Sequence, residues 1–286
     1  MSNLPVVSIC MIVYNQEQYI IQAIQGVLNQ EVDFNIELII ANDCSTDNTD
    51  EKISEIIKQH PKSNLIKYFN HENNLGMMPN FAFALQQCKG KFIALCEGDD
   101  YWTDPLKLKK QVDFLNTNKE INICFHRANV LKRDAKYIHP IPEPYQEKKF
   151  QFIELLKHYN FITTASVVFR KPEKLEFPKW FYRVPFGDLS LYKLLSKEAD
   201  IMCINQVMSV YRKHEKGAYS GIDKLKVKQN FLKFYTIIYP FLNKKEQEVV
   251  IAKKRSTQIN ISKLKFPNKP FLRKAYIMYL RYIQLD

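Results

Sequence analysis

Hydrophobic and polar positions in the first hundred residues alternate between two periods. Short apolar runs rich in β-branched residues predict buried strands, and stretches with an apolar residue every three or four positions predict amphipathic helices. The predicted strands span 6–13, 36–41, 65–69 and 91–96, and the predicted helices span 16–28 and begin near 47 and 79. Alternating strands and helices of this length predict an α/β fold. In it, a mostly parallel central sheet carries helices on both faces.

The remainder of the chain has a less regular pattern. Three prolines at 140, 142 and 144 indicate an extended segment. Further on, the pattern predicts helices at 150–159 and 189–195, a strand at 165–169 and an extended segment at 201–211. From Ile222 onward it is long, helical and rich in Lys, Phe and Tyr. We therefore predict one domain over 1–221, with halves at 1–100 and 101–221, and a basic, aromatic helical region over 222–286.

Polar clusters follow three of the predicted strands. They are Tyr14-Asn15 after the first, Asn42-Asp43 after the second, and Glu97-Gly98-Asp99-Asp100 after the fourth. Ligands of open α/β sheets bind outside the carboxyl ends of the strands. We therefore expect these side chains, which are distant in sequence, to line one crevice.

The third cluster places three carboxylates around a single glycine. Carboxylates so close together repel one another, and partial burial adds to the cost of ionising them. A hard divalent cation such as Mg²⁺ or Mn²⁺ would offset that repulsion, because it prefers oxygen ligands. The alternative is a solvated acidic loop, which is also common at strand ends.

Composition narrows the class of protein. The 286 residues are 46% hydrophobic and 25% charged, which is typical of a globular chain. We find no apolar run of the roughly 20 residues that span a bilayer and no signal-peptide pattern. The six cysteines form no CxxC pair, which favours a reducing, cytoplasmic location.

The formal net charge is +12, and the excess of cations is heaviest after Gly221. A basic chain fits nucleic acid, phosphate-bearing substrates or an anionic membrane surface. The seven glycines form neither GxGxxG nor GxxxxGK, so the dinucleotide-binding fingerprint and the phosphate-cradling P-loop are both missing.

Four motifs in order resemble glycosyltransferase family 2. They lie at 7–17, 38–47, 74–76 and 97–100, and the similarity continues thinly at 187–188 and 211–214. The resemblance implies a GT-A fold with a Rossmann-like sheet and a metal-dependent, inverting transfer from a nucleotide sugar, with a UDP-sugar favoured. The acceptor implied is a hydroxyl of a glycan or lipid-linked molecule, in synthesis of bacterial surface polysaccharide or lipooligosaccharide.

The resemblance also assigns roles to individual residues. Those assigned to the nucleotide sugar are Tyr14, Asn15, Glu17, Asp43, Asn74, Glu97 and Asp99. Those assigned to Mn²⁺ or Mg²⁺ are Asp99, Asp100 and His214, and the catalytic base is Asp188. Tyr14 would stack on the base and Asp43 would accept a hydrogen bond from it. The chain departs from the family pattern at Asn42 and Glu97, where aspartate is usual, and at 77–79, where no arginine stands.

Each of these roles has a structural alternative. Tyr14 could be a core aromatic side chain, and a lone histidine such as His214 is more often structural or exposed. Asp43 and Asp188 could instead cap the helices that follow them.

Two other functions compete with glycosyl transfer. A sugar-1-phosphate nucleotidyltransferase also uses acidic residues at a strand end, but it needs a glycine-rich loop that 14–18 lacks. A non-enzymatic, basic nucleic-acid-binding protein fits the charge but leaves the carboxylates after the fourth strand unexplained. We therefore expect no nucleic-acid partner.

The final segment, 270–283, predicts a helix that mixes aromatic, aliphatic and cationic residues. Such a helix suits a membrane interface, which predicts peripheral association at the inner face of the cytoplasmic membrane. The alternatives are packing on the catalytic domain or on a second copy in a homodimer.

Overall fold

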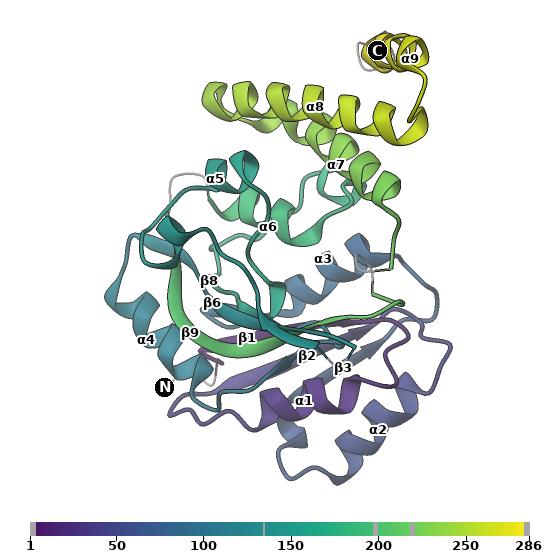
Figure 1. The fold of residues 1–286 in the computed structure, drawn as a ribbon. Helices are drawn as coiled ribbons and strands as arrows, with labels where there is room; N and C mark the ends of the chain where they lie inside the picture. The colour runs from purple at the N-terminus through teal and green to yellow at the C-terminus, as the bar shows by residue number, and fades with distance from the viewer. Residues whose placement is uncertain (1–3, 134, 197–199, 218–220, 283–286) are drawn as a thin grey trace.

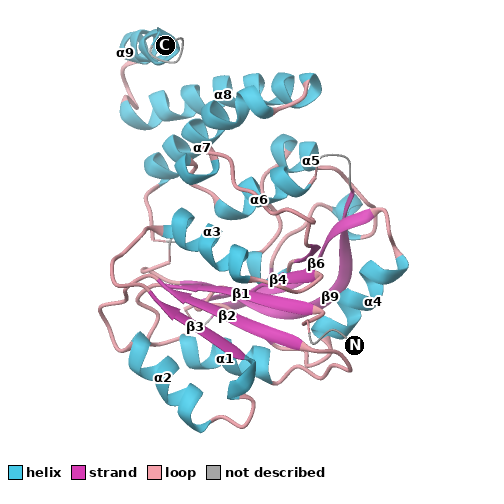
Figure 2. Cartoon of the chain, turned by 180° about the vertical axis from the view of Figure 1, so that it is seen from behind, coloured by secondary structure: helices cyan, strands magenta, loops and turns pink. Residues whose placement is uncertain are grey.

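The protein folds around one curled, mostly parallel sheet with helices on both faces (Figures 1 and 2). The computed structural model describes residues 4–133, 135–196, 200–217 and 221–282. The strands are β1 (Val7–Val13), β2 (Ile36–Asn42), β3 (Ile66–Asn70), β4 (Phe92–Leu95), β5 (Tyr101–Trp102), β6 (Ile121–Lys132), β7 (Ala135–Ile138), β8 (Val168–Arg170) and β9 (Asp200–Lys213). Their order is β3-β2-β1-β4-β8-β6-β9-β5, with β7 beside β6.

Strand direction divides the sheet into two parts. β1 to β4 are parallel, as the sequence predicts. β8 runs antiparallel to both β4 and β6, while β6 and β9 are parallel to each other. The short β5 pairs antiparallel with β9, placing Tyr101 opposite Val210. This last pairing brings the end of a long late strand beside the segment that follows β4.

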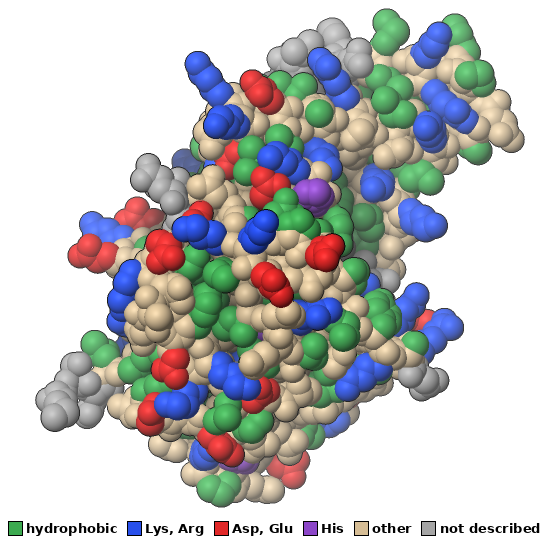
Figure 3. Space-filling view, turned by 60° about the vertical axis from the view of Figure 1, so that its left-hand side comes forward, with side chains coloured by type: hydrophobic (Ala, Val, Ile, Leu, Met, Phe, Trp, Pro, Cys, Tyr) green, Lys and Arg blue, Asp and Glu red, His purple; other side chains and the backbone are tan. Residues whose placement is uncertain are grey.

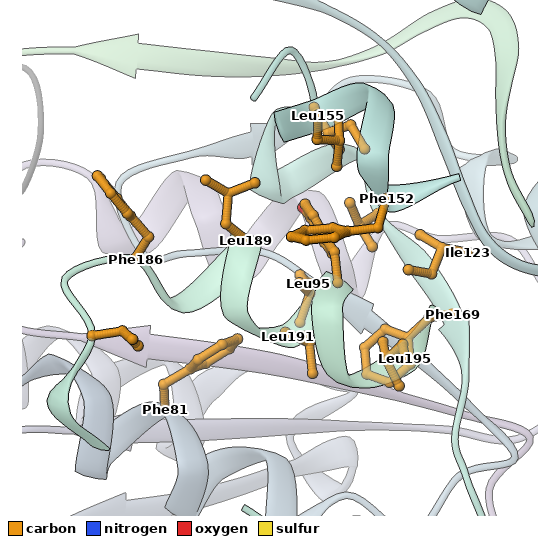
Figure 4. Packing of buried hydrophobic residues seen from close by; sticks show 14 of the residues in the cluster. Phe81, Leu95, Ile123, Phe152, Leu155, Phe169, Phe186, Leu189, Leu191 and Leu195 are labelled. Carbon is orange, nitrogen blue, oxygen red and sulfur yellow. The ribbon is translucent and has the colours of Figure 1, made fainter. Parts of the chain in front are cut away.

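Alternation along β1 explains why both faces are covered. Val7, Ile9 and Met11 pack with α1 (Ile20–Leu28), α2 (Thr49–Gln59) and α4 (Lys107–Thr117). Cys10 points to the other face, toward α3 (Met77–Gln87), α5 (Phe152–Lys157) and α6 (Gly187–Leu195). Successive side chains of a strand point to opposite faces, so one short apolar run supplies two cores. Figure 4 shows the second core, where Phe81, Leu95 and Leu191 meet.

Several elements of the middle region differ from the sequence prediction. α4 and β6 are regular elements that the hydrophobic pattern did not predict. The predicted helix at 150–159 is confined to α5, because Phe150 forms a β-bridge with Ile201. Residues Thr164–Ser166 form a 3₁₀ turn before β8, and Glu143–Gln146 form another within the proline-rich segment.

The C-terminal region is helical, as predicted, and consists of α7 (Lys224–Ile238), α8 (Lys244–Lys265) and α9 (Pro270–Tyr282). These helices lie beyond α5 and α6, on the far side from α1 and α2 (Figure 1). α7 packs on the second core, the one shown in Figure 4, because the centre of the Phe234 ring lies 5.3 Å from that of Phe186. Ile283, at the end of the predicted last helix, lies outside the described residues. Across the described part of the chain, every helix is too short or too polar to cross a membrane.

Candidate active site

The loop after β1 is held to the loop after β2 by side chain to backbone hydrogen bonds. Asn15 has a left-handed backbone, with φ 53°, which asparagine tolerates better than most residues. Its Oδ1 accepts from Thr46 N at 2.8 Å, and its own N–H donates to Ser45 Oγ at 2.9 Å. Asn15 thus shapes this turn, and the adjacent Tyr14 ring is left 48% exposed. That exposure excludes a fully buried core role for Tyr14.

Glu17 and Asp43 are both engaged in local hydrogen bonds. The Glu17 Oε2 atom accepts from the side chain of Asn48 at 3.0 Å, just before α2. Asp43 is buried, and its two carboxylate oxygens accept from Leu75 N at 2.7 Å and Gly76 N at 2.9 Å. Asn74 in turn donates to the Asp43 carbonyl at 3.0 Å. Asp43 therefore holds the 74–76 turn in place, rather than capping α2.

The acidic segment after β4 meets the end of β9. The Asp99 Oδ2 and His214 Nε2 atoms lie 3.0 Å apart, so the structure unites two residues predicted to bind metal. Asp100 is fully buried, and its Oδ1 accepts from the Arg212 N–H at 2.8 Å. Its Oδ2 has no hydrogen-bond partner. The pairing of β5 with β9 produces these contacts, because it aligns Tyr101 with Val210.

Arg212 stabilises the contact between the acidic segment after β4 and the end of β9. Its guanidinium donates to the Asp99 carbonyl at 2.5 Å and to the side chain of Gln22. The guanidinium carbon also lies 4.3 Å from the centre of the Tyr101 ring. A cation over an aromatic face adds stabilisation beyond the hydrogen bonds. Arg212 thus fixes the backbone at Asp99 while its own main chain holds Asp100.

Asp99 and His214 lie close enough together to be ligands of one divalent ion. Within the described residues, no three His, Cys, Asp or Glu side chains are grouped to hold a metal ion. The pair Asp99 and His214 nevertheless supplies one oxygen and one nitrogen donor. Mg²⁺ in nucleotide sites is commonly held by one or two carboxylates plus substrate phosphates. The residues present therefore fit an ion that is completed by a diphosphate.

Glu97 lies close to two other carboxyl groups, those of Asp99 and Asp188. Burial, together with the charges of Asp99 and Asp188, raises the pKa of Glu97 to about 8, although a hydrogen bond from Thr164 opposes this shift. The next residue is Gly98, at a position where side chains of β1 and the loop after it leave no space for a Cβ atom. A Cβ at this position would lie 2.3 Å from Gln16 Oε1 and 3.0 Å from Val13. The glycine therefore lets the acidic turn press against the end of β1.

Asp188 lies in the first turn of α6, on the face of the sheet that α3 and α5 also cover. The N-cap of this helix is Phe186, so Asp188 is not the N-cap residue. Its Oδ1 accepts from Leu189 N at 2.7 Å, and its Oδ2 accepts from Asn160 Nδ2. Burial raises the pKa of the Asp188 carboxyl despite these hydrogen bonds.

Four polar residues near these carboxyl groups were assigned no role from the sequence. Burial raises the pKa of Tyr211, and the charges of Asp100, Glu97, Asp99 and Asp188 add to this effect. Tyr192 is fully buried, its hydroxyl lacks a hydrogen-bond partner, and burial together with the charges of Asp188 and Glu97 raises its pKa. Asn160 and Thr164 complete the group. Tyr211 stands within the family-like segment 211–214 and Tyr192 lies one helical turn after Asp188, so the positions of these two could have been noticed in advance.

The site therefore brings together residues that follow β4 and β9 with a residue of α6. It holds the carboxyl groups of Glu97, Asp99 and Asp188, with Asp99 next to His214. Such a site can neutralise a developing negative charge through a bound cation and accept a proton from a hydroxyl group.

Comparison with known proteins places these residues in a family context. The model of the family described as glycosyl transferase family 2 matches residues 8–175. An uncharacterized protein of Mycobacterium tuberculosis is 37% identical over 213 residues, which cover 74% of this chain and 60% of the relative. An uncharacterized glycosyltransferase of Haemophilus influenzae is 30% identical over 241 residues, covering 84% of this chain and 87% of the relative. This chain thus matches about three-fifths of the length of the mycobacterial relative.

Solved structures share the fold at low sequence identity. The structure of Staphylococcus aureus TarS in complex with UDP-GlcNAc aligns with a TM-score of 0.66 and 16% identity, covering 96% of this chain and 78% of that chain. The mannosyltransferase PcManGT of Pyrobaculum calidifontis, in complex with GDP-Man and Mn²⁺, aligns with a TM-score of 0.60 and 13% identity, covering 100% and 82%. These likenesses show that the chain has the GT-A fold.

Proposed function

Because this chain belongs to glycosyl transferase family 2, we propose that it transfers a sugar from a nucleotide-sugar donor to a hydroxyl group. One observation carries the proposal beyond family membership. The acidic segment after β4 lies near the start of α6, close enough for the charge of Asp188 to raise the pKa of Glu97. Two acidic groups around one reacting centre are what a single displacement requires.

In this proposal the donor binds across the ends of β1 and β2. The exposed Tyr14 ring offers a face on which the nucleobase stacks. Asn15, Glu17 and Asn74 shape the walls through the hydrogen bonds described above. Asp43 acts by holding the backbone of the 74–76 turn against the donor. We favour a UDP-sugar, a form of donor found in complex with TarS.

Asp99 and His214 would hold Mn²⁺ or Mg²⁺ together with the diphosphate of the donor. The ion, when bound, supplies neutralisation of the leaving diphosphate. Asp100 would position the acidic segment rather than bind the ion through Oδ1, because this atom accepts a hydrogen bond from the Arg212 N–H. Arg212 keeps the Asp99 carbonyl in register, so that the Asp99 carboxylate points toward His214.

Asp188 is the proposed general base. The acceptor oxygen attacks the anomeric carbon, the bond from that carbon to the diphosphate oxygen breaks, and the acceptor proton passes to Asp188. The raised pKa of Asp188 makes it a stronger base than an ordinary aspartate. Attack on the face opposite the leaving group inverts the anomeric centre.

The acceptor proposed is a hydroxyl of a glycan or of a lipid-linked sugar in bacterial surface polysaccharide or lipooligosaccharide synthesis. Synthesis of such molecules from nucleotide sugars takes place in the cytoplasm, where we place this protein. This part of the proposal rests on family resemblance and on the basic C-terminal region.

The experiment is a panel of nucleotide sugars incubated with the protein and Mn²⁺. We expect one donor to raise the melting temperature and to be slowly hydrolysed to the nucleoside diphosphate and sugar. Release of sugar 1-phosphate or consumption of pyrophosphate would instead indicate a nucleotidyltransferase. If no donor of the panel binds or turns over, the proposal fails.

A further inference from the structure

The outermost helices, α8 and α9, carry large apolar side chains that face solvent. We define the C-terminal surface by Ile251, Arg255 and Ile259 of α8 and Phe271, Met278 and Tyr279 of α9. Phe271 is 80% exposed, Met278 is 70% exposed and Tyr279 is 57% exposed. These three residues lie at i, i+7 and i+8, so they share one face of α9.

This exposed face is distinct from the face that packs α9 against the protein. Leu280 is buried and clusters with Leu232 of α7 and Ile261 of α8, with Tyr276 packed beside them. α9 therefore has one apolar face that anchors it and a second apolar face turned outward. A helix that served only an internal core would need one such face.

α8 repeats the combination of apolar and cationic residues on its own exposed side. Ile251, Arg255, Ile259 and Lys263 follow one another at intervals of four and are all exposed. Side chains four apart lie above one another on a helix, so aliphatic and cationic groups alternate along one line. Blue and green side chains also intermix over the upper right part of the molecule in Figure 3, where the C-terminal helices lie.

Nearly all of the net positive charge belongs to this region. Residues 222–286 contain 15 Lys and Arg and 4 Asp and Glu, whereas residues 1–221 contain 27 and 26. The catalytic part is thus almost neutral and the helical part is strongly basic. A charge segregated in this way on one end of the molecule creates a directional field.

We propose that the C-terminal surface docks the protein on an anionic lipid bilayer. The apolar side chains of α9 would enter the boundary between headgroups and acyl chains, and the cations of α8 would meet the lipid phosphates. Arginine and lysine can extend to the headgroups while their aliphatic stems cover apolar surface. No membrane span is needed for this, and α8 and α9 would lie in the plane of the interface.

A second copy of the chain and nucleic acid each fit this surface less well than a bilayer. A second copy would bring two strongly basic surfaces together, and like charges across an interface repel. Nucleic acid would satisfy the cations, but it would leave Phe271 and Met278 without an apolar partner. An anionic bilayer satisfies both kinds of side chain.

The test is flotation of the full-length protein with vesicles of phosphatidylcholine alone or mixed with phosphatidylglycerol, over a range of salt concentrations. We expect flotation with the mixed vesicles at low salt and a decrease as salt rises. The double variant Arg255→Glu with Lys263→Glu should bind at least about tenfold more weakly, since each surface cation contributes roughly a fivefold factor. Phe271→Ser with Met278→Ser should weaken binding in a way that low salt does not restore.

Matched control variants carry the same kinds of substitution at exposed positions outside the C-terminal surface. Lys58→Glu with Lys119→Glu repeats the charge reversal on the catalytic part, and Tyr137→Ser with Ile138→Ser repeats the apolar loss on β7. Both controls should float like the unmodified protein, and circular dichroism checks that every variant is folded.

Three results would overturn the proposal. They are failure of the unmodified protein to float with anionic vesicles, equal loss of flotation in the controls, and a doubled molecular mass in solution that Phe271→Ser abolishes. The readout is binding, so it does not depend on the proposed transfer activity.

Discussion

Asp188 is the residue on which the proposed chemistry depends most directly. Its carboxyl group is oriented by Asn160 and by the Leu189 N–H, and burial raises its pKa. We predict that Asp188→Asn leaves donor binding unchanged and lowers kcat by about a hundredfold or more, the scale of a positioned acid–base group. Calorimetric titration of the donor and initial-rate measurements check the two parts.

Glu248→Gln, at an exposed site on α8, is the matched control and should keep full kcat. Asp188→Asn with unchanged turnover but a lower melting temperature would assign Asp188 a purely structural role.

Asp99 tests the proposed ion. Its carboxylate lies beside His214, whereas that of Asp100 is held by the Arg212 backbone. We predict that Asp99→Asn removes most of the dependence of nucleotide binding on Mn²⁺. Full activity in the presence of a chelator would contradict the requirement for a metal. Asp33→Asn changes a carboxylate that is exposed on the surface and paired with Lys109, and it should bind Mn²⁺ and nucleotide normally.

Lys107 gives a prediction about pH. Its ammonium is fully buried over the Trp102 ring at 3.9 Å and has no hydrogen-bond partner. Burial lowers the pKa of Lys107 to about 7, whereas in the unfolded chain this side chain has its ordinary pKa of 10.5. Between these values the unfolded state binds more protons, so this group adds stability as pH rises.

We therefore predict that Lys107→Met is more stable than the unmodified protein below pH 7, and that this advantage shrinks as pH rises toward 10.5. Urea unfolding of both proteins across this range measures the difference. A difference in unfolding free energy that does not change with pH would show that Lys107 remains charged in the fold.

At the scale of elements, the start of α8 joins the helical region to the catalytic part. The Asn243 side chain accepts from Glu246 N at 3.0 Å, and the Glu246 carboxylate accepts from Asn243 N at 3.0 Å. Glu246 is also paired with Lys193 of α6 at 2.6 Å. This reciprocal cap satisfies backbone N–H groups that have no partner within the helix.

We predict that Asn243→Ala lowers the free energy of unfolding by about 1 kcal/mol, the usual cost of losing an N-cap. Asn260→Ala, at an exposed position later in α8, should be neutral or slightly stabilising, because alanine favours helix. Chemical denaturation compares the two variants. Equal stabilities would mean that α8 does not depend on its cap.

The pairing of β5 with β9 is the element contact that assembles the site. β5 has only two residues, yet its register with β9 sets Asp99 and Asp100 beside Arg212 and His214. A short strand carries little hydrophobic signal of its own. Its position is fixed by the longer partner strand, which is buried at Ser209 and Val210, the residues that pair with β5.

At the scale of the whole molecule, the two proposed functions belong to different ends of the structure. The residues proposed to bind the donor follow β1, β2 and β4, and the basic helices α7, α8 and α9 lie beyond α5 and α6 (Figure 1). α6 and α7 connect them, because Phe186, two residues before Asp188, packs on Phe231 and Phe234. The helical region therefore supports the backbone that presents Asp188.

Pattern alone predicted the parallel half of the sheet and the polar clusters that follow its strands. β1, β2, β3 and β4 match the predicted strands to within one or two residues. β1, β2 and β4 are almost entirely buried, because both faces of this parallel sheet are covered, whereas β3 at the sheet edge is partly exposed. Because β1 lies parallel to both β2 and β4, the polar residues that follow these strands are at the same edge of the sheet, where α/β sheets bind ligands. The C-terminal helices and their excess of cations were also evident from the sequence.

Tertiary structure decided what the apolar pattern conceals. α4 and β6 were missed because they bury polar side chains, including Lys107, Gln111 and His126, which interrupt the expected pattern. Gln111 is tolerated because its amide donates to the Ser166 carbonyl at 2.9 Å, a partner 55 residues away. The partners of Asp188, Asp99 and Asp100 likewise come from distant segments. Only folding brings such residues together, because hydrogen bonds between them depend on strand register and helix packing rather than on local sequence.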